Sequence, residues 1–224
     1  MPIYKTSKAV LSVQNNPAQF LNGLTSNVMS APQNALLNIY GKIIAAFDQL
    51  KISDNEYWLV VEKQFMPDVM NHLNRYARIS GVKLEEKNLN VYFDLSADYQ
   101  LKSGECSIMQ KKGKLILTPN ELTADISEEA FTLFRVRNHI PLHGVDYKDE
   151  FLLNVSMADL VSFTKGCYLG QEPVAKVYNR SKPTWKLVVA SENQCSLEEQ
   201  ANMTSRVKNP TSGVTMGFVF VKND

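Results

Sequence analysis

Residues 164–180 read TKGCYLGQEPVAKVYNR, and this stretch is the most unusual window in the chain. Cys167 follows Lys165 and Gly166 directly. A neighbouring cation lowers the pKa of a thiol and a glycine leaves the sulfur accessible, which are the two conditions for a reactive cysteine. The spacing is equally typical of a glycine-containing turn in which the cysteine is a small apolar residue. The residues alone leave both interpretations open.

The same stretch carries further groups that suit a bound ligand. Gln171 and Glu172 offer an amide and a carboxylate for hydrogen bonds to a polar ring. Lys176 and Arg180 add cations beyond them, although such a run of charges is also typical of a solvated surface. The candidate binding or motif residues here are Lys165, Gly166, Tyr168, Gly170, Gln171, Glu172, Lys176 and Arg180.

Composition and charge exclude several classes of protein. The 224 residues include 24 Lys and Arg against 23 Asp and Glu, a formal charge of +1, which provides no field for holding a polyanion. The hydrophobic fraction of 44% is that of a globular protein. No stretch reaches the roughly 18 apolar residues of a membrane span, and no signal-peptide pattern opens the chain. We therefore expect a cytoplasmic monomer that binds neither membranes nor nucleic acid directly.

Cysteine and histidine spacing argues against a resident metal. The odd number of cysteines and the lack of a CxxC pair indicate reduced thiols, too few and too dispersed for an iron–sulfur cage. His139 and His143 stand four residues apart, but Pro141 forbids the regular helix that would bring both imidazoles to one face. We expect no permanently bound metal. The three cysteines are Cys106, Cys167 and Cys195.

Apolar periodicity predicts a mixed α and β fold that uses the same pattern twice. Strands are expected over 3–13, 35–40, 42–50, 56–62, 90–95, 106–110 and 114–118. Helices are expected from Pro17, over 66–77 with Gly81 ending the element, and after Ser127 as the N-cap. Beyond residue 180, two strand candidates at 185–190 and 214–221 form a small β tail.

The run KGCYLGQEPVAK closely resembles the signature of the YgfZ family, folate-binding relatives of the glycine cleavage T-protein that assist iron–sulfur enzymes and have a mitochondrial counterpart, IBA57. Residues 140–146 (IPLHGVD) look like the family's Ile-Pro-x-x-Gly-x-Asp segment. Residues 20–27 (FLNGLTSN) resemble its N-terminal Phe-Leu-Gln-Gly segment, so the resemblance covers most of the chain. The matching signature residues are Lys165, Gly166, Cys167, Tyr168, Gly170, Gln171, Glu172, Ala175 and Lys176.

This resemblance implies an α+β, T-protein-like fold. Two closely packed sheet-plus-helix units, about 1–83 and 84–180, would surround a central cavity and form a folate-binding region over 1–180. Residues 181–224 would form a short, β-barrel-like domain. The resemblance also implies binding of tetrahydrofolate or a derivative, and help in assembling, maintaining or repairing iron–sulfur enzymes, including those that modify tRNA. Those enzymes or their assembly factors would be transient partners, and Cys167 the functional thiol.

Several positions depart from the T-protein pattern. Ala45 and Ala46 stand where T-proteins carry a functional aspartate, so their aminomethyl transfer is not expected here. Asn154 replaces a pterin-holding glutamate, and Val28 replaces the aspartate expected after Asn27. A carboxylate accepts two parallel hydrogen bonds, whereas an amide offers one acceptor and one donor, so the substitution predicts weaker folate binding. Asn27 and Asn154 complete the candidate folate-contacting residues.

Two other functions remain open. A folate-dependent one-carbon transferase could use a different acid, such as Asp48 or Glu172. A cysteine hydrolase would need a base beside Cys167, and of the histidines only His139 or His143 is a candidate for that role.

Overall fold

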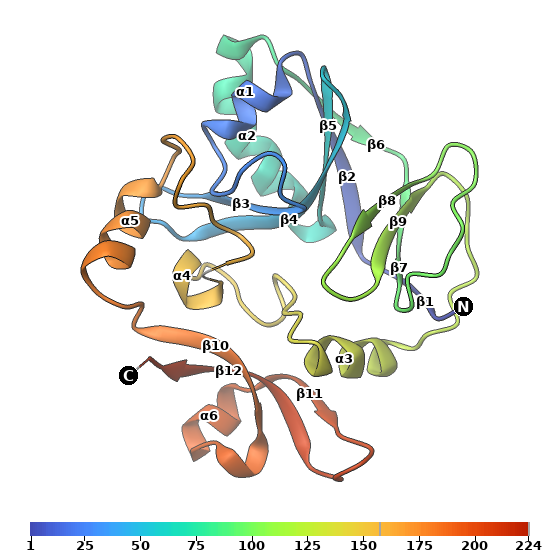
Figure 1. The fold of residues 1–224 in the computed structure, drawn as a ribbon, viewed down its shortest axis with the longest axis vertical. Coiled ribbons are helices and arrows are strands. Elements are labelled where there is room, and N and C mark those ends of the chain that lie inside the picture. The colour runs from blue at the N-terminus through green and yellow to red at the C-terminus, as the bar shows by residue number, and fades with distance from the viewer. Residues whose placement is uncertain (157, 224) are drawn as a thin grey trace.

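The computed structural model describes residues 1–156 and 158–223, and within them the strands form three antiparallel sheets (Figure 1). The first sheet has five strands in the order β3-β4-β5-β2-β6. They are β2 (Lys8–Gln14), β3 (Gln33–Leu37), β4 (Ile43–Ser53), β5 (Glu56–Glu62) and β6 (Lys83–Lys87).

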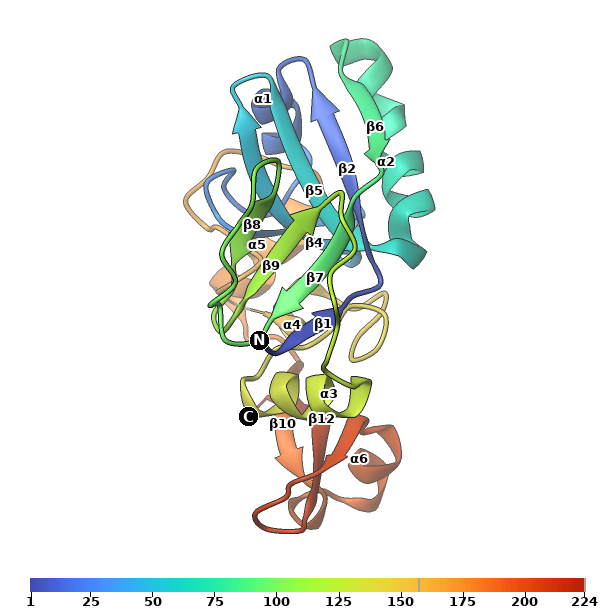
Figure 2. The ribbon, with the colours of Figure 1, turned by 90° about the vertical axis from the view of Figure 1, so that its right-hand side faces the viewer.

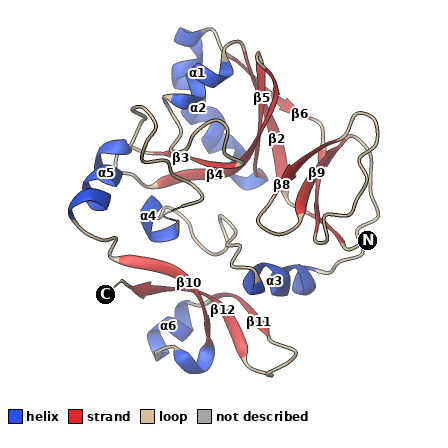
Figure 3. Cartoon of the chain, viewed as in Figure 1, coloured by secondary structure: helices blue, strands red, loops and turns tan. Residues whose placement is uncertain are grey.

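Both faces of the five-stranded sheet are covered. Along β2, Ala9 and Leu11 pack with the helices α1 and α2, whereas Val10 packs with the second sheet. Because successive side chains of a strand point to opposite faces, a strand buried on both sides is apolar throughout. The covering helices, seen on one side of the sheet in Figure 3, are α1 (Pro17–Asn22) and α2 (Met66–Ser80). A short 3₁₀ turn, η1 (Lys63–Phe65), leads into α2.

The second sheet contains four strands in the order β1-β7-β9-β8. Its first strand comes from the start of the chain, because Ile3 pairs with Asp94. The second sheet therefore includes a strand from the stretch expected to form the first unit. The strands are β1 (Ile3–Lys5), β7 (Asn90–Asp94), β8 (Cys106–Met109) and β9 (Lys114–Thr118).

Helix α3 (Glu128–Arg137) connects the second sheet to the third. Ser127 is its N-cap, as predicted, and accepts a hydrogen bond from the Ala130 amide. Phe131 packs with the second sheet, and Val136 packs with Val207 and Phe218 of the third. Figure 2 shows α3 between the upper sheets and the C-terminal sheet.

The C-terminal sheet has three strands in the order β10-β12-β11 and is open. Three strands are too few to close a barrel, so the tail is a reduced form of the expected barrel-like domain. Its elements are β10 (Trp185–Ser191), η2 (Glu192–Gln194), α6 (Leu197–Asn202), β11 (Thr204–Lys208) and β12 (Thr215–Lys222). Two helices precede it, α4 (Leu152–Val155) and α5 (Gln171–Arg180). None of the described helices is long and apolar enough to cross a membrane.

Candidate ligand-binding cavity

A cavity lies where the three sheets meet the loop 139–147. It consists of two adjoining chambers, with volumes of about 160 Å³ and about 290 Å³. The first chamber reaches β10 at residues 187–189, and the second reaches the aromatic rings of Tyr4 and Phe131. The chambers share a wall made of Lys8, Gln33, Asp48, Glu62, Gln110 and residues 140–142.

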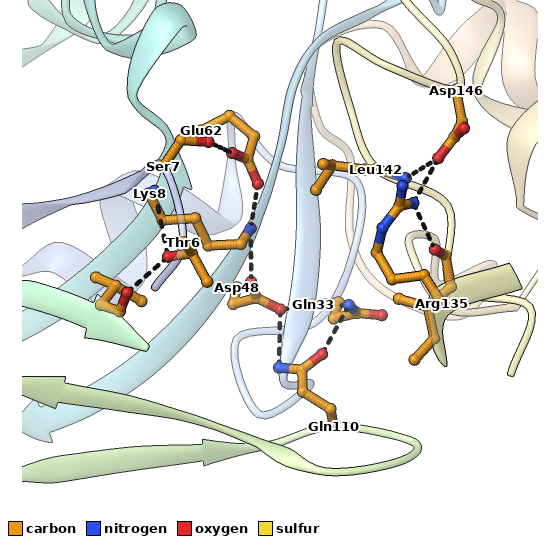
Figure 4. A network of polar contacts seen from close by, with 12 residues as sticks. Thr6, Ser7, Lys8, Gln33, Asp48, Glu62, Gln110, Arg135, Leu142 and Asp146 are labelled. Atoms are coloured by element: carbon orange, nitrogen blue, oxygen red, sulfur yellow. Dashed lines mark hydrogen bonds and ion pairs between the residues drawn. The ribbon is translucent and has the colours of Figure 1, made fainter. Parts of the chain in front are cut away.

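The shared wall contains a row of three charged side chains (Figure 4). The Lys8 Nζ lies 3.2 Å from Asp48 Oδ2 and 3.0 Å from Glu62 Oε1. Strand register causes this meeting, because Lys8 pairs with Glu62 across β2 and β5, and Asp48 pairs with the residue two before Glu62. The side chains are 14%, 6% and 4% exposed, so the row, with one ammonium and two carboxylates, carries a buried charge of −1.

The proton on Lys8 is firmly held. Burial by itself lowers the pKa of Lys8, but the charges of Asp48 and Glu62 and their hydrogen bonds outweigh it, so the pKa rises above its ordinary value. Ser7 Oγ donates to Glu62 Oε2 at 2.9 Å. The amides of Gln33 and Gln110 both donate to Asp48 Oδ1. The wall is thus a pre-ordered polar surface shared by the two chambers.

A buried ion pair fixes the loop 139–147, whose residues 140–142 complete the shared wall. Arg135 Nη1 donates to Asp146 Oδ2 at 2.7 Å, and the same oxygen accepts a hydrogen bond from the Leu142 amide. Asp146 Oδ1 accepts hydrogen bonds from Thr204 and Ser205 of β11. A single carboxylate therefore joins α3, the loop 139–147 and the C-terminal sheet.

His143 occupies the same loop and lines the first chamber. Its ring stacks on Phe65 with centroids 3.8 Å apart and tilts against Tyr147 at 5.0 Å. The residue is only 4% exposed, and burial lowers the pKa of its imidazole to about 4. Neither ring nitrogen has a hydrogen-bond partner among the described residues. His143 is therefore neutral at pH 7, with its hydrogen-bonding capacity unused.

The structure places Cys167 outside the cavity, in the loop that precedes α5. Its side chain is exposed, whereas Cys106 and Cys195 are half-buried, and all three are free thiols. No described residue of the 164–180 stretch lines either chamber. No hydrogen bond within the described chain joins Cys167 to His139 or His143, so the geometry gives no support to a cysteine–histidine hydrolase.

Lys165 has a structural position that the sequence did not predict. Its Nζ donates to the backbone carbonyl oxygens of Asn22, Thr25 and Asn27, at 2.9 Å for Asn22 and 3.0 Å for Asn27. The ammonium also lies 4.9 Å from the centre of the Tyr168 ring, and burial lowers its pKa to about 8. These three hydrogen bonds hold the loop 22–27 against the motif. The Lys165 ammonium is therefore not directed solely at the Cys167 thiol.

The two asparagines expected to touch folate are buried and bonded within the protein. Asn27 donates to the carbonyls of Gln33 and Asp159. Asn154, in α4, donates to Glu150 Oε1 at 2.8 Å and accepts from the Trp185 amide. Neither lines a chamber, and their folate contact remains a prediction.

The remaining motif residues build α5 and its attachment. Gly170 precedes the helix with φ +83°, and a Cβ there would lie 2.4 Å from the Asn38 carbonyl oxygen, so only glycine fits. Tyr168 belongs to a buried apolar cluster, and Gly166 is exposed. Along α5, Gln171 is half-buried and the charged Glu172, Lys176 and Arg180 are exposed.

Sequence reasoning missed most of the cavity wall. The sequence pattern assigned no role to Lys8 or Glu62, and Asp48 was considered only as a replacement acid. The alternation along β4 was the available signal, because Asp48 is two residues beyond Ala46 and both line the first chamber.

Comparison with known proteins agrees with this architecture. The glycine cleavage aminomethyltransferase T of Bartonella henselae superposes with a TM-score of 0.74 at 15% identity, covering 97% of this chain and 77% of that one. An iron–sulfur cluster assembly factor IBA57 homolog of Dictyostelium discoideum is 23% identical over 193 residues, and a tRNA-modifying protein YgfZ of Buchnera aphidicola is 23% identical over 168. The chain is a distant relative of the YgfZ and IBA57 proteins. Its fold is that of the T-protein.

This YgfZ-like chain differs in extent from its relatives. It spans 47% of the length of the IBA57 homolog, and that match includes 72% of this chain. It spans 53% of the length of the Buchnera YgfZ, and that match includes 59% of this chain. An uncharacterized protein of Haemophilus influenzae is 26% identical over 189 residues, which cover 78% of this chain and 68% of that protein. No family model matches the sequence.

Proposed function

We propose that the protein binds tetrahydrofolate or a derivative in the central cavity. The observation that carries this proposal is the polar wall of Lys8, Asp48 and Glu62 inside a hollow bounded by all three sheets. The two chambers together come into the range of small-molecule pockets, about 300 to 1,000 Å³. A pterin ring presents several N–H donors, and carboxylates are suitable acceptors for them.

In this proposal the cavity wall, rather than Asn154, supplies the carboxylate that holds the folate ring. The Asn154 amide is engaged by Glu150 and Trp185 and lines neither chamber. Glu62 lines both chambers and, with contacts within the described chain only from Lys8 and Ser7, keeps acceptor capacity for a ligand. This predicts that the loss of the family's glutamate is offset by a carboxylate from another strand. Asn154→Glu is therefore expected to disturb α4 rather than to strengthen binding.

We also infer that the protein assists iron–sulfur enzymes, including those that modify tRNA, through Cys167. The names of the Dictyostelium and Buchnera relatives support this role. The exposed thiol is available to a partner protein, while burial raises the pKa of Cys106 and Cys195, so a smaller fraction of each is present as the reactive thiolate. The ligand would thus bind in the cavity, and the partner protein would bind at the exposed surface around Cys167.

Two experiments test these roles separately. Titration of the purified protein with 5-formyltetrahydrofolate, followed by calorimetry, should show saturable binding, and no binding at millimolar concentration would exclude the folate role. Deletion of the gene followed by iron–sulfur enzyme assays should show a loss that wild type restores and Cys167→Ala does not. Cys106→Ala is the matched control and should restore activity. Full rescue by Cys167→Ala would remove the thiol from the proposal.

One observation favours a second candidate, a one-carbon transferase. Asp48 lines the cavity two residues beyond Ala46, so a carboxylate is present near the position where T-proteins carry their acid. Its oxygens are engaged by Lys8, Gln33 and Gln110, so a substrate would have to displace one of these contacts to use the carboxylate. Turnover of an aminomethyl donor by purified protein, abolished in Asp48→Asn, would establish the transferase.

A further inference from the structure

Burial of the unpaired His143 ring lowers the stability of the fold in the state described. Both ring nitrogens are buried and find no hydrogen-bond partner in residues 1–156 and 158–223, although an imidazole in water satisfies both. A phenylalanine would fill the same slot between Phe65 and Tyr147 without that cost. Buried polar groups without partners are uncommon in folded proteins and point to a ligand, a water or a functional role.

The loop around His143 holds the ring in one position. Gly144 has φ +86°, and a Cβ there would lie 2.8 Å from the Phe65 ring, so the absence of a side chain lets the loop approach that ring. The Gly144 amide donates to the Tyr147 carbonyl at 2.8 Å, and Asp146 anchors the following turn. These contacts fix the backbone of the loop, whereas both ring nitrogens are covered in this state, so a ligand in the first chamber reaches them when the ring turns about its side-chain bonds.

We propose that His143 is the residue of the cavity that selects the ligand's ring, by a hydrogen bond from its neutral imidazole to a planar, uncharged heterocycle with an amide-like edge. This inference rests on the proposed folate function and names the ring as the part of the ligand that the cavity recognises. A neutral imidazole has one donor and one acceptor, while Glu62 on the shared wall only accepts. A ligand edge that carries an N–H donor beside a second polar atom can pair with Glu62 through the N–H and with His143 through the other atom. A pterin has such an edge.

The chain offers a matched control for the test. His72 is also a buried histidine with an unpartnered Nε2, but it lies in α2 and lines neither chamber. We would measure binding of 5-formyltetrahydrofolate, of tetrahydropterin, which lacks the tail, and of p-aminobenzoylglutamate, which lacks the pterin ring. His143→Phe should weaken the first two by about tenfold, the loss of one hydrogen bond, and leave the third unchanged. His72→Phe should bind all three like wild type.

A second measurement removes any dependence on the folding of the variant. The chain has three histidines, so ¹⁵N-histidine labelling of the wild type gives a small, assignable set of imidazole resonances. Tetrahydropterin should shift the ring nitrogens of His143 and leave those of His72 in place.

The outcomes separate this inference from the function on which it rests. If wild type binds the folate while His143→Phe binds it equally well, or the His143 nitrogens do not shift, the ring-selecting role is overturned and folate binding stands. If wild type binds neither the folate nor tetrahydropterin, the proposed function itself is overturned.

Discussion

Arg135 and Asp146 form an ion pair of 2.7 Å with side chains only 4% and 0% exposed. The pair joins α3 to the loop that carries His143 and, through Thr204 and Ser205, to β11. It therefore holds together three segments that close one side of the cavity.

Asp146→Asn should strongly destabilise the protein. Removing one charge leaves the Arg135 guanidinium buried without a counterion, which costs about 3 to 5 kcal/mol. Chemical denaturation at pH 7 measures the loss. Asp54→Asn, which breaks the exposed pair with Lys51, is the control and should have no measurable effect. An Asp146 variant as stable as the control would contradict the anchoring role.

His143 should make the protein less stable in mild acid. Burial holds the pKa of its imidazole near 4, with Glu62 and Asp149 raising the pKa and Lys8 and Lys148 lowering it, against about 6.5 in the unfolded chain. Between these values the unfolded state binds more protons, so stability is complete above pH 6.5 and falls as the pH drops toward 4. The His143 contribution to that fall is about 3 kcal/mol.

Denaturation of wild type and His143→Phe across pH 4 to 7.5 checks this dependence. The variant should show a correspondingly shallower loss. His139→Asn is the control, because His139 is exposed with φ +54°, a conformation that asparagine tolerates, and should follow wild type. Identical profiles for wild type and His143→Phe would mean that His143 is not a buried neutral residue.

Lys165→Met should loosen the contact between the motif and residues 22–27. Three backbone carbonyls lose a charged donor, and hydrogen bonds to charged groups contribute about 1.5 to 3 kcal/mol each. Hydrogen exchange should increase over 22–27 with little change in the C-terminal sheet. Lys176→Met, an exposed lysine of the same motif, serves as the control. Unchanged exchange in Lys165→Met would rule out this structural role.

Gly144→Ala should weaken both the fold and ligand binding. The new Cβ is strained at φ +86° and meets the Phe65 ring, so the cost exceeds about 1 kcal/mol and the loop with His143 is displaced. Gly81→Ala is matched in backbone conformation, with φ +68°, but its Cβ meets nothing within 4 Å. It should cost about 1 kcal/mol and leave folate binding intact. Calorimetric titration and thermal unfolding distinguish the two glycines.

The sequence by itself determined the elements that depend on local chemistry. Periodicity located β5, α2 and β9, the Ser127 hydroxyl marked the start of α3, and Gly81 ended α2 with a left-handed backbone. The motif at 164–180 indicated the resemblance to the YgfZ proteins, because a run of specific residue types can be recognised without knowledge of its contacts. The polar strand β6 and the helices α5 and α6 were missed, since their patterns are short or weakly apolar.

Only the tertiary structure decided which polar groups meet. Lys8, Asp48 and Glu62 are separated by up to 54 positions in the sequence. Antiparallel register places the Lys8 ammonium within 3.2 Å of a carboxylate oxygen of each of the other two. Lys165 stands two positions from Cys167, yet its ammonium is bonded to carbonyls up to 143 positions away. Neighbouring residues in the sequence determine the local backbone conformation. The partner of a long side chain depends instead on which segments pack against it, and the fold as a whole decides that.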